Sequence, residues 1–499
     1  DPTNGTSDEE TTTPTDEEPA TDTETPVEDP EQGTEPEASA DETGTATTTE
    51  ETGQDDGITT EKELIDAISS AEAGDTITLA GDITLTSQLT IDNGKEIVLD
   101  LYGHTLNAGS NTISVTGESS LTIETSSGKG KITAEQQIEV DSASLTLNSG
   151  EIEITGTSDK SYGIYVLNNG FVTVNNGTIN SNYAALAGNN TTGDMNFEVN
   201  GGRLSAKNGP AIYMPGQVQL LITNGTINGG ISLRMGQVKI SGGTINAVTT
   251  NIDSPAQYYN YSGNAWLPDA LYVFNGTYTS DNEEYGNSLN LEITGGTFNC
   301  TNDQGSAVAI YDIGKEAQES AVTISGEAVM TNSAEGRSAY QVLSLKDIGV
   351  ETPESGYGVH VGDIESSITG GTFSNDVSEY VAAGYACKES GGNYVVSELN
   401  ADNSVAQGGD EYYQTLAEAV EAIVTSESKS GTVTLLKDAQ GSGIGLFNSK
   451  GATCVNLTID FGGHVYTCDD PAVGSAGYES QGFHLEKGNT VTLKNGTIQ

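Results

Sequence analysis

The sequence has few basic residues, few cysteines and no long apolar run, and each shortage excludes a class of protein. It has 18 Lys and Arg against 72 Asp and Glu in 499 residues, and a formal net charge of −54. So acidic a chain is unsuited to binding nucleic acid or an anionic membrane surface. No apolar run approaches the length of a membrane-spanning helix. A disulfide scaffold or a zinc site would need more cysteines, more closely spaced, than Cys300, Cys387, Cys454 and Cys468.

Residues 1–57 differ in composition from the rest of the chain. They hold 20 Asp or Glu, 16 Thr and 6 of the 12 Pro, and no Lys or Arg. Such a segment cannot bury enough apolar surface to offset its ordering entropy, so it is predicted to be a disordered acidic stalk. It either carries O-glycans and holds a domain away from a surface, or is a plain solvated linker. The chain begins at Asp1 and not at Met, which indicates a mature or cut product of an exported protein.

One short pattern recurs along the chain from about residue 74. An alternating apolar run leads to Asn-Gly or Gly-Gly, then usually to Thr and a second apolar residue. Alternation with a period of two indicates strands with one buried face, and Gly supplies the positive-φ corner between them. Copies of the pattern are VTVNNGTIN (172–180), FEVNGGRLS (197–205), LLITNGTIN (220–228), VKISGGTIN (238–246), LEITGGTFN (291–299) and SITGGTFS (367–374).

The repeat predicts an all-β solenoid. Each copy also has a second half, seen as GIYV (163–166), AIYM (211–214) and AIYD (309–312), so a repeat contributes two or three short strands. One such unit cannot bury its apolar face alone, whereas stacked units share a continuous core. The coil length favours a parallel β-helix, and the number of copies favours roughly a dozen coils.

A helix-capping motif that marks the start of a β-helix domain occurs twice in the chain. Thr60-x-x-Glu63 predicts a capped helix near 60–72 that covers the open end of the core. Thr415-x-x-Glu418 repeats the motif 355 residues later, and TIDFGGHVYT (458–467) repeats VLDLYGHTLN (98–107). We therefore predict a first β-helix domain over 58–400 and the start of a second, truncated β-helix domain over 401–499.

These patterns resemble a known superfamily. The coil pattern is similar to that of right-handed parallel β-helix, or pectate-lyase-like, proteins. The run Tyr412-Tyr413-x-Thr415-Leu416-x-Glu418-Ala419-Val420 and the closing Tyr380-Val-x-x-Gly384-Tyr385 resemble adhesin-like surface proteins of gut Gram-positive anaerobes. The resemblance covers 58–499 and implies a right-handed β-helix in an extracellular, cell-surface or secreted protein.

The resemblance also requires a search for catalytic residues. If the protein were a polysaccharide lyase of this superfamily, the resemblance would imply a basic residue as proton acceptor, a neighbouring Arg and acidic residues that bind Ca²⁺. Arg203 and Arg234 lie in successive repeats, so a small basic strip is conceivable, but solubilising surface charges are the favoured interpretation of these and of Arg337. His104 and His464 occupy equivalent positions, which favours packing over catalysis. No catalytic residue, metal site or cofactor is predicted.

Two long interruptions of the repeat are rich in aromatic residues. Long loops on a regular scaffold often carry function, and aromatic faces beside Asn and Asp suit sugar stacking or protein contacts. The competing interpretation is that the first insertion folds back over the coils, with its aromatic residues as a local core. The predicted ligand-binding residues are Tyr258, Tyr259, Tyr261, Trp266 and Tyr272 from the first interruption, and Tyr340 and Tyr357 from the second.

The sequence therefore predicts a non-catalytic, adhesin-like protein that binds through loops on a β-helix rod. The expected partner is a host glycoprotein, such as mucin or an immunoglobulin, or a carbohydrate. The rod is expected to be monomeric within a longer chain whose repetition adds reach and avidity. Two alternatives stay open: a polysaccharide lyase or glycoside hydrolase of the β-helix superfamily, and a structural spacer module of a larger surface protein.

Overall fold

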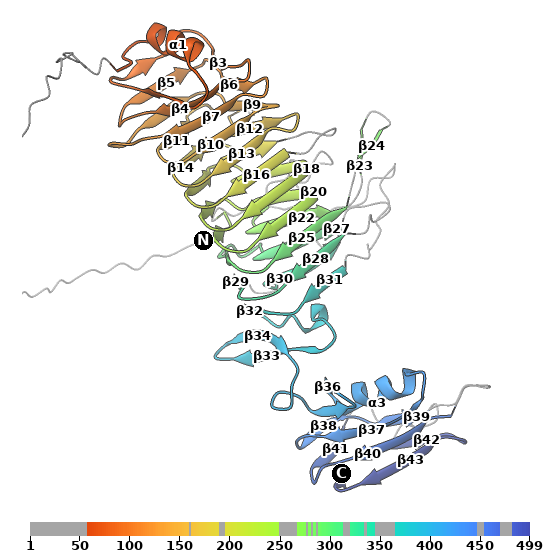
Figure 1. Ribbon diagram of the computed structural model, residues 1–499. Coiled ribbons are helices and arrows are strands. Elements are labelled where there is room, and N and C mark those ends of the chain that lie inside the picture. The colour runs from red at the N-terminus through yellow and green to blue at the C-terminus, as the bar shows by residue number, and fades with distance from the viewer. Residues whose placement is uncertain are drawn as a thin grey trace, which may run out of the picture. The chain divides into compact units, whose positions relative to one another are not determined.

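The structure is a computed structural model of the chain (Figure 1). Nearly all of the predicted stalk, residues 1–56, lies outside the residues that it describes. The described residues are 57–158, 161–188, 195–248, 267–275, 278–280, 283–285, 288–312, 320–333, 337–344, 365–446, 454–469 and 482–499.

The first and largest part of the described chain is a parallel β-helix with three ladders of strands (Figure 1). Each coil except the last contributes one strand to each ladder in turn, and neighbouring strands of ladder one pair in parallel from coil to coil. Ladder one contains β1 (Asp75–Thr78), β4 (Glu96–Asp100), β7 (Ser120–Glu124), β10 (Ser144–Leu147), β13 (Phe171–Val174), β16 (Met195–Val199), β25 (Leu289–Ile293), β28 (Ala321–Ile324) and β31 (Glu365–Ile368).

Ladder two follows ladder one across the Asn-Gly or Gly-Gly bend. The predicted corner glycines adopt positive φ, as at Gly177 (φ 92°) and Gly225 (φ 107°), where an L-side chain would be strained. Ladder two contains β2 (Ile83–Thr84), β5 (Thr105–Gly109), β8 (Lys131–Ala134), β11 (Glu151–Ile154), β14 (Thr178–Ser181), β17 (Arg203–Ala206), β19 (Thr226–Asn228), β21 (Thr244–Asn246), β26 (Thr297–Cys300), β29 (Val329–Asn332) and β32 (Gly371–Phe373).

Ladder three completes each coil. It contains β3 (Leu89–Ile91), β6 (Ile113–Thr116), β9 (Ile138–Asp141), β12 (Ile164–Leu167), β15 (Leu186–Gly188), β22 (Leu271–Asn275), β27 (Val308–Asp312) and β30 (Tyr340–Ser344). Two longer strands, β18 (Ile212–Ile222) and β20 (Ile231–Ile240), run from ladder three into ladder one without a break. The described residues thus make eleven coils, close to the dozen predicted.

Alternating burial explains the core. In β16 the side chains of Met195, Phe197 and Val199 are buried, while the two residues between them are half-exposed. The same alternation in each ladder lines the interior with stacked Ile, Leu, Val and Phe side chains, which form one continuous hydrophobic core. An all-β parallel solenoid is therefore the fold, as the period-two pattern predicts.

The first core is closed at both ends. Helix α1 (Glu61–Ser70) begins at Thr60 with the predicted capping box to Glu63, and its buried Leu64 and Ile68 belong to the core. At the other end β32 pairs antiparallel with β34 (Asn393–Glu398), which itself pairs antiparallel with β33 (Tyr385–Ser390). The remaining elements near this part are the antiparallel pair β23 (Tyr278–Ser280) and β24 (Glu283–Tyr285), and the short 3₁₀ helix η2 (Ser378–Tyr380).

A second, separate hydrophobic core begins at Ala406. Its helix α3 (Leu416–Thr425) again has a capping box, between Thr415 and Glu418. The other elements are β35 (Ala406–Gly408), β36 (Glu411–Tyr413), β37 (Ser430–Leu435), β38 (Ala439–Ser442), β39 (Ile444–Leu446), β40 (Asn456–Asp460), β41 (Val465–Asp469), β42 (Phe483–Leu485), β43 (Thr490–Lys494) and β44 (Thr497–Ile498).

Local structure repeats at the offset of 360 residues seen in the sequence. Strands β4 and β5 correspond residue for residue to β40 and β41. His104 Nδ1 lies 3.7 Å from Asp82 Oδ1, and His464 Nδ1 lies 3.4 Å from Asp438 Oδ1. In both places the same Asp oxygen accepts a hydrogen bond from the backbone after the His. These histidines therefore belong to a bend motif, while the domain limits at 57 and 400 stay predictions. No helix among the described residues is long and apolar enough to cross a membrane.

Candidate ligand-binding groove

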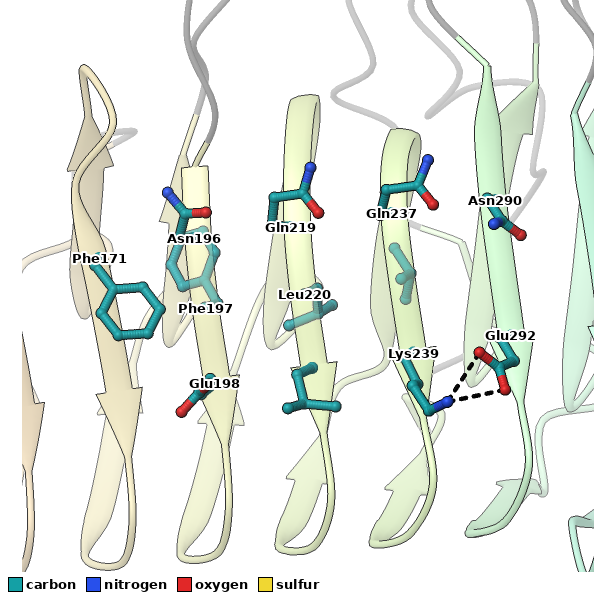
Figure 2. A pocket seen from close by; sticks show the side chains of 12 residues that line it. Phe171, Asn196, Phe197, Glu198, Gln219, Leu220, Gln237, Lys239, Asn290 and Glu292 are labelled. Atoms are coloured by element: carbon teal, nitrogen blue, oxygen red, sulfur yellow. Dashed lines mark hydrogen bonds and ion pairs between the residues drawn. The ribbon is translucent and has the colours of Figure 1, made fainter.

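An open groove of about 510 Å³ crosses the outer face of ladder one, from β13 to β25 (Figure 2). Because side chains alternate along each strand, the groove collects the outward-pointing residues of five successive coils. Its outward-pointing lining residues are Phe171, Asn196, Glu198, Gln219, Leu221, Gln237, Lys239, Asn290 and Glu292.

One row of the groove consists of carboxamides, and we call it the amide row. Asn196 pairs in register with Gln219, Gln219 with Gln237, and Gln237 with Asn290. Figure 2 shows these four side chains side by side on neighbouring strands. Neighbouring strands lie about 4.8 Å apart, so the groove presents one amide at each such interval. All four side chains are half-exposed or exposed.

The amide row differs from another row of amides on the same face of the sheet. Asn175 donates to Asn148 Oδ1 at 2.9 Å, and Asn200 donates to Asn175 Oδ1 at 3.1 Å, so this row satisfies itself. Within the described part of the chain, the side-chain amides of Gln219, Gln237 and Asn290 make no hydrogen bond to protein. Each offers two N–H donors and a carbonyl acceptor to solvent or to a ligand.

A charged row runs beside the amide row. It consists, in register, of Glu198, Leu221, Lys239 and Glu292. The Lys239 ammonium donates to both carboxylate oxygens of Glu292, at 2.9 and 3.0 Å, and both side chains are about half-exposed. Among the described residues that line the groove, the net charge is therefore that of one carboxylate, on Glu198, which no lysine or arginine neutralises.

An aromatic ring ends the amide row on one side. Phe171 pairs in register with Asn196 and leaves 37% of its surface exposed, which is unusual for Phe in this fold. On the other side Asn290 is followed in register by Ala321, whose methyl group offers no hydrogen bond. The groove therefore has a defined length of five strands, with a stacking platform at β13.

Five of the seven aromatic residues predicted to bind a ligand lie outside the described residues, so the structure does not test them. These are Tyr258, Tyr259, Tyr261, Trp266 and Tyr357.

The other two predicted aromatic residues, Tyr272 and Tyr340, are buried, and their contact with a ligand stays a prediction. Tyr272 lies on the outer face of ladder three and packs with Leu267, Phe274 and Tyr311 in a small hydrophobic cluster. Burial raises the pKa of its hydroxyl, which accepts hydrogen bonds from Ser232 and the Leu267 backbone. As placed, the ring has no surface left for a sugar.

Tyr340 is buried for a different reason, which is its register. It pairs with Val308 and so falls on an inward-pointing position of ladder three. Its hydroxyl lies 2.6 Å from the Ser366 hydroxyl, and its ring meets that of Tyr380 edge-on at 4.9 Å between centroids. Tyr340 is therefore a core residue.

The basic strip that the sequence made conceivable does not form. Arg203 is on β17 in ladder two, whereas Arg234 is on β20 where that strand belongs to ladder three. Arg234 is only 2% exposed, and its guanidinium carbon lies 6.0 Å from the centroid of the Phe274 ring. The interpretation of Arg234 as a solubilising surface charge is thus wrong, because this side chain is buried over the ring of Phe274, in the hydrophobic cluster on the outer face of ladder three.

A buried carboxylate that sequence reasoning missed ties successive coils together. Asp269 is fully buried, accepts from the Ser306 backbone at 2.7 Å, and accepts from the Tyr311 hydroxyl at 2.6 Å. Arg337 donates to the same hydroxyl at 3.2 Å and to the Gln304 carbonyl at 2.8 Å. Nothing in the sequence distinguishes this residue from the other acids, since its burial depends on packing between distant segments.

Asp269 makes stability depend on pH. Burial raises the pKa of its carboxyl to about 6, although Arg337 and the two hydrogen bonds oppose the shift. Because this folded-state pKa lies above the unfolded value near 3.8, its stabilising contribution is complete below pH 4 and is lost as pH rises through 6. We expect the free energy of unfolding of the wild type, minus that of Asp269→Asn, to fall by about 2 kcal/mol between pH 4 and pH 7.

Chemical denaturation at pH 4, 5, 6 and 7 measures this difference. Subtracting the variant removes the contributions of the other carboxylates, among them Asp376, whose pKa hydrogen bonds from Ser378 hold below its usual value. A difference that is flat with pH would contradict the burial of Asp269.

Comparison with family models, with curated proteins and with solved structures finds no match to this chain. The fold and the groove therefore define the class by themselves: a parallel β-helix protein with an amide-lined groove on one sheet face.

Proposed function

We propose that the protein is an extracellular, adhesin-like binding protein that holds a glycan in the ladder-one groove without cleaving it. The observation that carries the proposal is the amide row: Gln219, Gln237 and Asn290 present donors and acceptors that the described protein leaves unused. Sugar hydroxyls both donate and accept hydrogen bonds, and side-chain amides are complementary to them. Phe171 adds an apolar surface on which a sugar ring can stack.

Charge spacing in the groove favours binding over cleavage. Glycoside hydrolases place two carboxyl groups about 5 to 9.5 Å apart across the scissile bond. The two carboxylates of the groove, on Glu198 and Glu292, are separated by three strand spacings, about 14 Å. Glu292 is in addition ion-paired with Lys239. Asp269, whose carboxyl has a raised pKa, is fully buried away from the groove.

The partner and the location are proposed on more general grounds. The glycan belongs either to a host glycoprotein, such as mucin or an immunoglobulin, or to a free polysaccharide, because both present the same hydroxyl chemistry. The extracellular location is supported by the strongly acidic composition, the stalk-like segment 1–57 and the resemblance to surface proteins.

We expect the double variant Gln219→Ala/Gln237→Ala to lose glycan retention at least about tenfold, because two ligand hydrogen bonds of ordinary strength are removed. The measurement passes the full chain over immobilised mucin glycans, immunoglobulin and plant polysaccharides, and records both retained protein and released sugar. The thermal midpoint is expected to stay unchanged, since neither side chain is buried.

The matched control is Gln136→Ala/Gln440→Ala, which removes two exposed amides that do not line the groove. It is expected to be retained like the wild type. Equal loss in both double variants would show a general surface effect and sink the groove as the site. Sugar release would favour the lyase or hydrolase alternative. Absence of retention on every support would favour the spacer alternative.

A further inference from the structure

We infer that the groove selects an uncharged, linear polysaccharide that runs along the axis of the solenoid with one sugar unit at each coil. The inference rests on the proposed function and adds the substrate class to it. Three features of the groove carry it: the spacing of the amide row, its two ends, and the charges of the neighbouring row.

The spacing of the amide row favours a periodic ligand. The amides of Gln219, Gln237 and Asn290 lie on successive coils and in register, so a ligand crossing these strands meets an equivalent group about every 4.8 Å. A compact or highly branched ligand can use one or two of these groups. Only an extended chain whose units repeat near this interval can bond to Gln219, Gln237 and Asn290 together, whereas the Asn196 amide already donates to the Gly170 carbonyl.

The two ends of the row set the length of the chain. Phe171 precedes the row by one coil and offers a ring face, while Ala321 follows it by one coil and offers no polar group. The groove spans five strands, counting β13 of Phe171 and ending at β25, the last strand before Ala321. The affinity is therefore expected to rise with chain length up to about five units, one per strand spacing, and then to level off.

The charged row excludes an acidic chain. Among the described residues of the groove, Lys239 carries the one ammonium, and it already donates to both carboxylate oxygens of Glu292, so it is not available to a uronate. Glu198 adds an unneutralised negative charge in the same row, and the whole chain carries −54. An anionic polysaccharide is thus repelled both locally and at long range. A cationic polysaccharide would find only one unpaired carboxylate, on Glu198, over the five described strands of the groove, so its charge is poorly matched as well.

Titration calorimetry on the full chain tests the inference. The neutral probes are gluco-, xylo-, manno- and galacto-oligosaccharides of two to eight units, and the acidic probes are oligogalacturonates of the same lengths. We expect at least one neutral series to gain affinity with each unit up to about five units and none beyond. We expect every acidic series to bind at least about tenfold more weakly at 50 mM salt.

A variant locates one end of the chain. Phe171→Ala is expected to weaken the five-unit ligand by about three- to tenfold, as the loss of one aromatic stacking contact does. Three results would overturn the inference. They are an affinity for neutral oligosaccharides that is already maximal at two units, acidic oligosaccharides that bind as tightly as neutral ones, and no binding of any neutral series. Retention of an acidic polysaccharide through Gln219 and Gln237 would sink this inference alone, whereas no retention of any glycan would sink the proposed function.

Discussion

Replacing Phe298 by Ala is expected to lower the free energy of unfolding by about 3–5 kcal/mol. Phe298 is fully buried in β26, where it stacks in register between Ile245 and Met330 on the inward side of ladder two. Removing the ring leaves a cavity between coils that the rigid ladders on either side cannot collapse to fill. The shift of the chemical denaturation midpoint at constant slope measures the effect.

Phe171→Ala is the matched control for this prediction. The same substitution is made in a strand of the same solenoid, but on the outer face, where the ring is 37% exposed. We expect it to cost about 1 kcal/mol or less. If the two variants lost the same stability, the assignment of Phe298 to the inside and Phe171 to the outside of the coils would be wrong.

Replacing Gly236 by Ala is expected to lower the free energy of unfolding by about 4 kcal/mol. Gly236 lies in β20 where that strand passes from ladder three into ladder one, and its φ is 115°. A Cβ atom at this position would lie 2.0 Å from the carbonyl oxygen of Val218 on the neighbouring coil. Both the backbone strain and the overlap with a backbone atom must be relieved by moving the coils apart.

Gly94→Ala separates these two causes. Gly94 also has a positive φ, 69°, but a Cβ atom there would meet no atom within 4 Å. Gly94→Ala is therefore expected to lower the free energy of unfolding only by the strain of the left-handed conformation, about 1–2 kcal/mol. Thermal and chemical unfolding of the two variants give the comparison. Equal losses would mean that the close approach of β20 to β18 at Gly236 does not exist in solution.

Most of the fold follows from local patterns in the sequence. The period-two alternation places Phe197 inward, the glycine at each bend takes a positive φ, and the two capping boxes begin helices where Thr60 and Thr415 predict them. Each of these features depends on a few neighbouring residues, so a single repeat contains the information that is needed.

The groove could not be predicted in the same way. The residues of the amide row are evenly spaced in the structure but unevenly spaced in the sequence. Asn196, Gln219, Gln237 and Asn290 are separated by 23, 18 and 53 residues, since insertions of different length lie between the coils. Only the strand register brings them into one row. The sequence does show that each is an outward position of an apolar alternation, and that signal is common to most coils.

The burial of Tyr272 and Tyr340 could not be predicted for a related reason. Aromatic composition does not say on which side of a sheet a ring lies or what covers it. Tyr340 falls on an inward register position, and Tyr272 is covered by a local core that includes Leu267. Asp269 and its partners Tyr311 and Arg337 lie on three different coils, so no local sequence pattern indicates that Asp269 is buried.

The most direct test of the groove as a glycan site is a crystal structure of the chain with a neutral oligosaccharide of five or six units bound. The account predicts sugar density along ladder one, parallel to the solenoid axis, with the amides of Gln219 and Gln237 within hydrogen-bond distance and one ring against Phe171. Density on the outer face of ladder three, or across a single strand of ladder one, would contradict it.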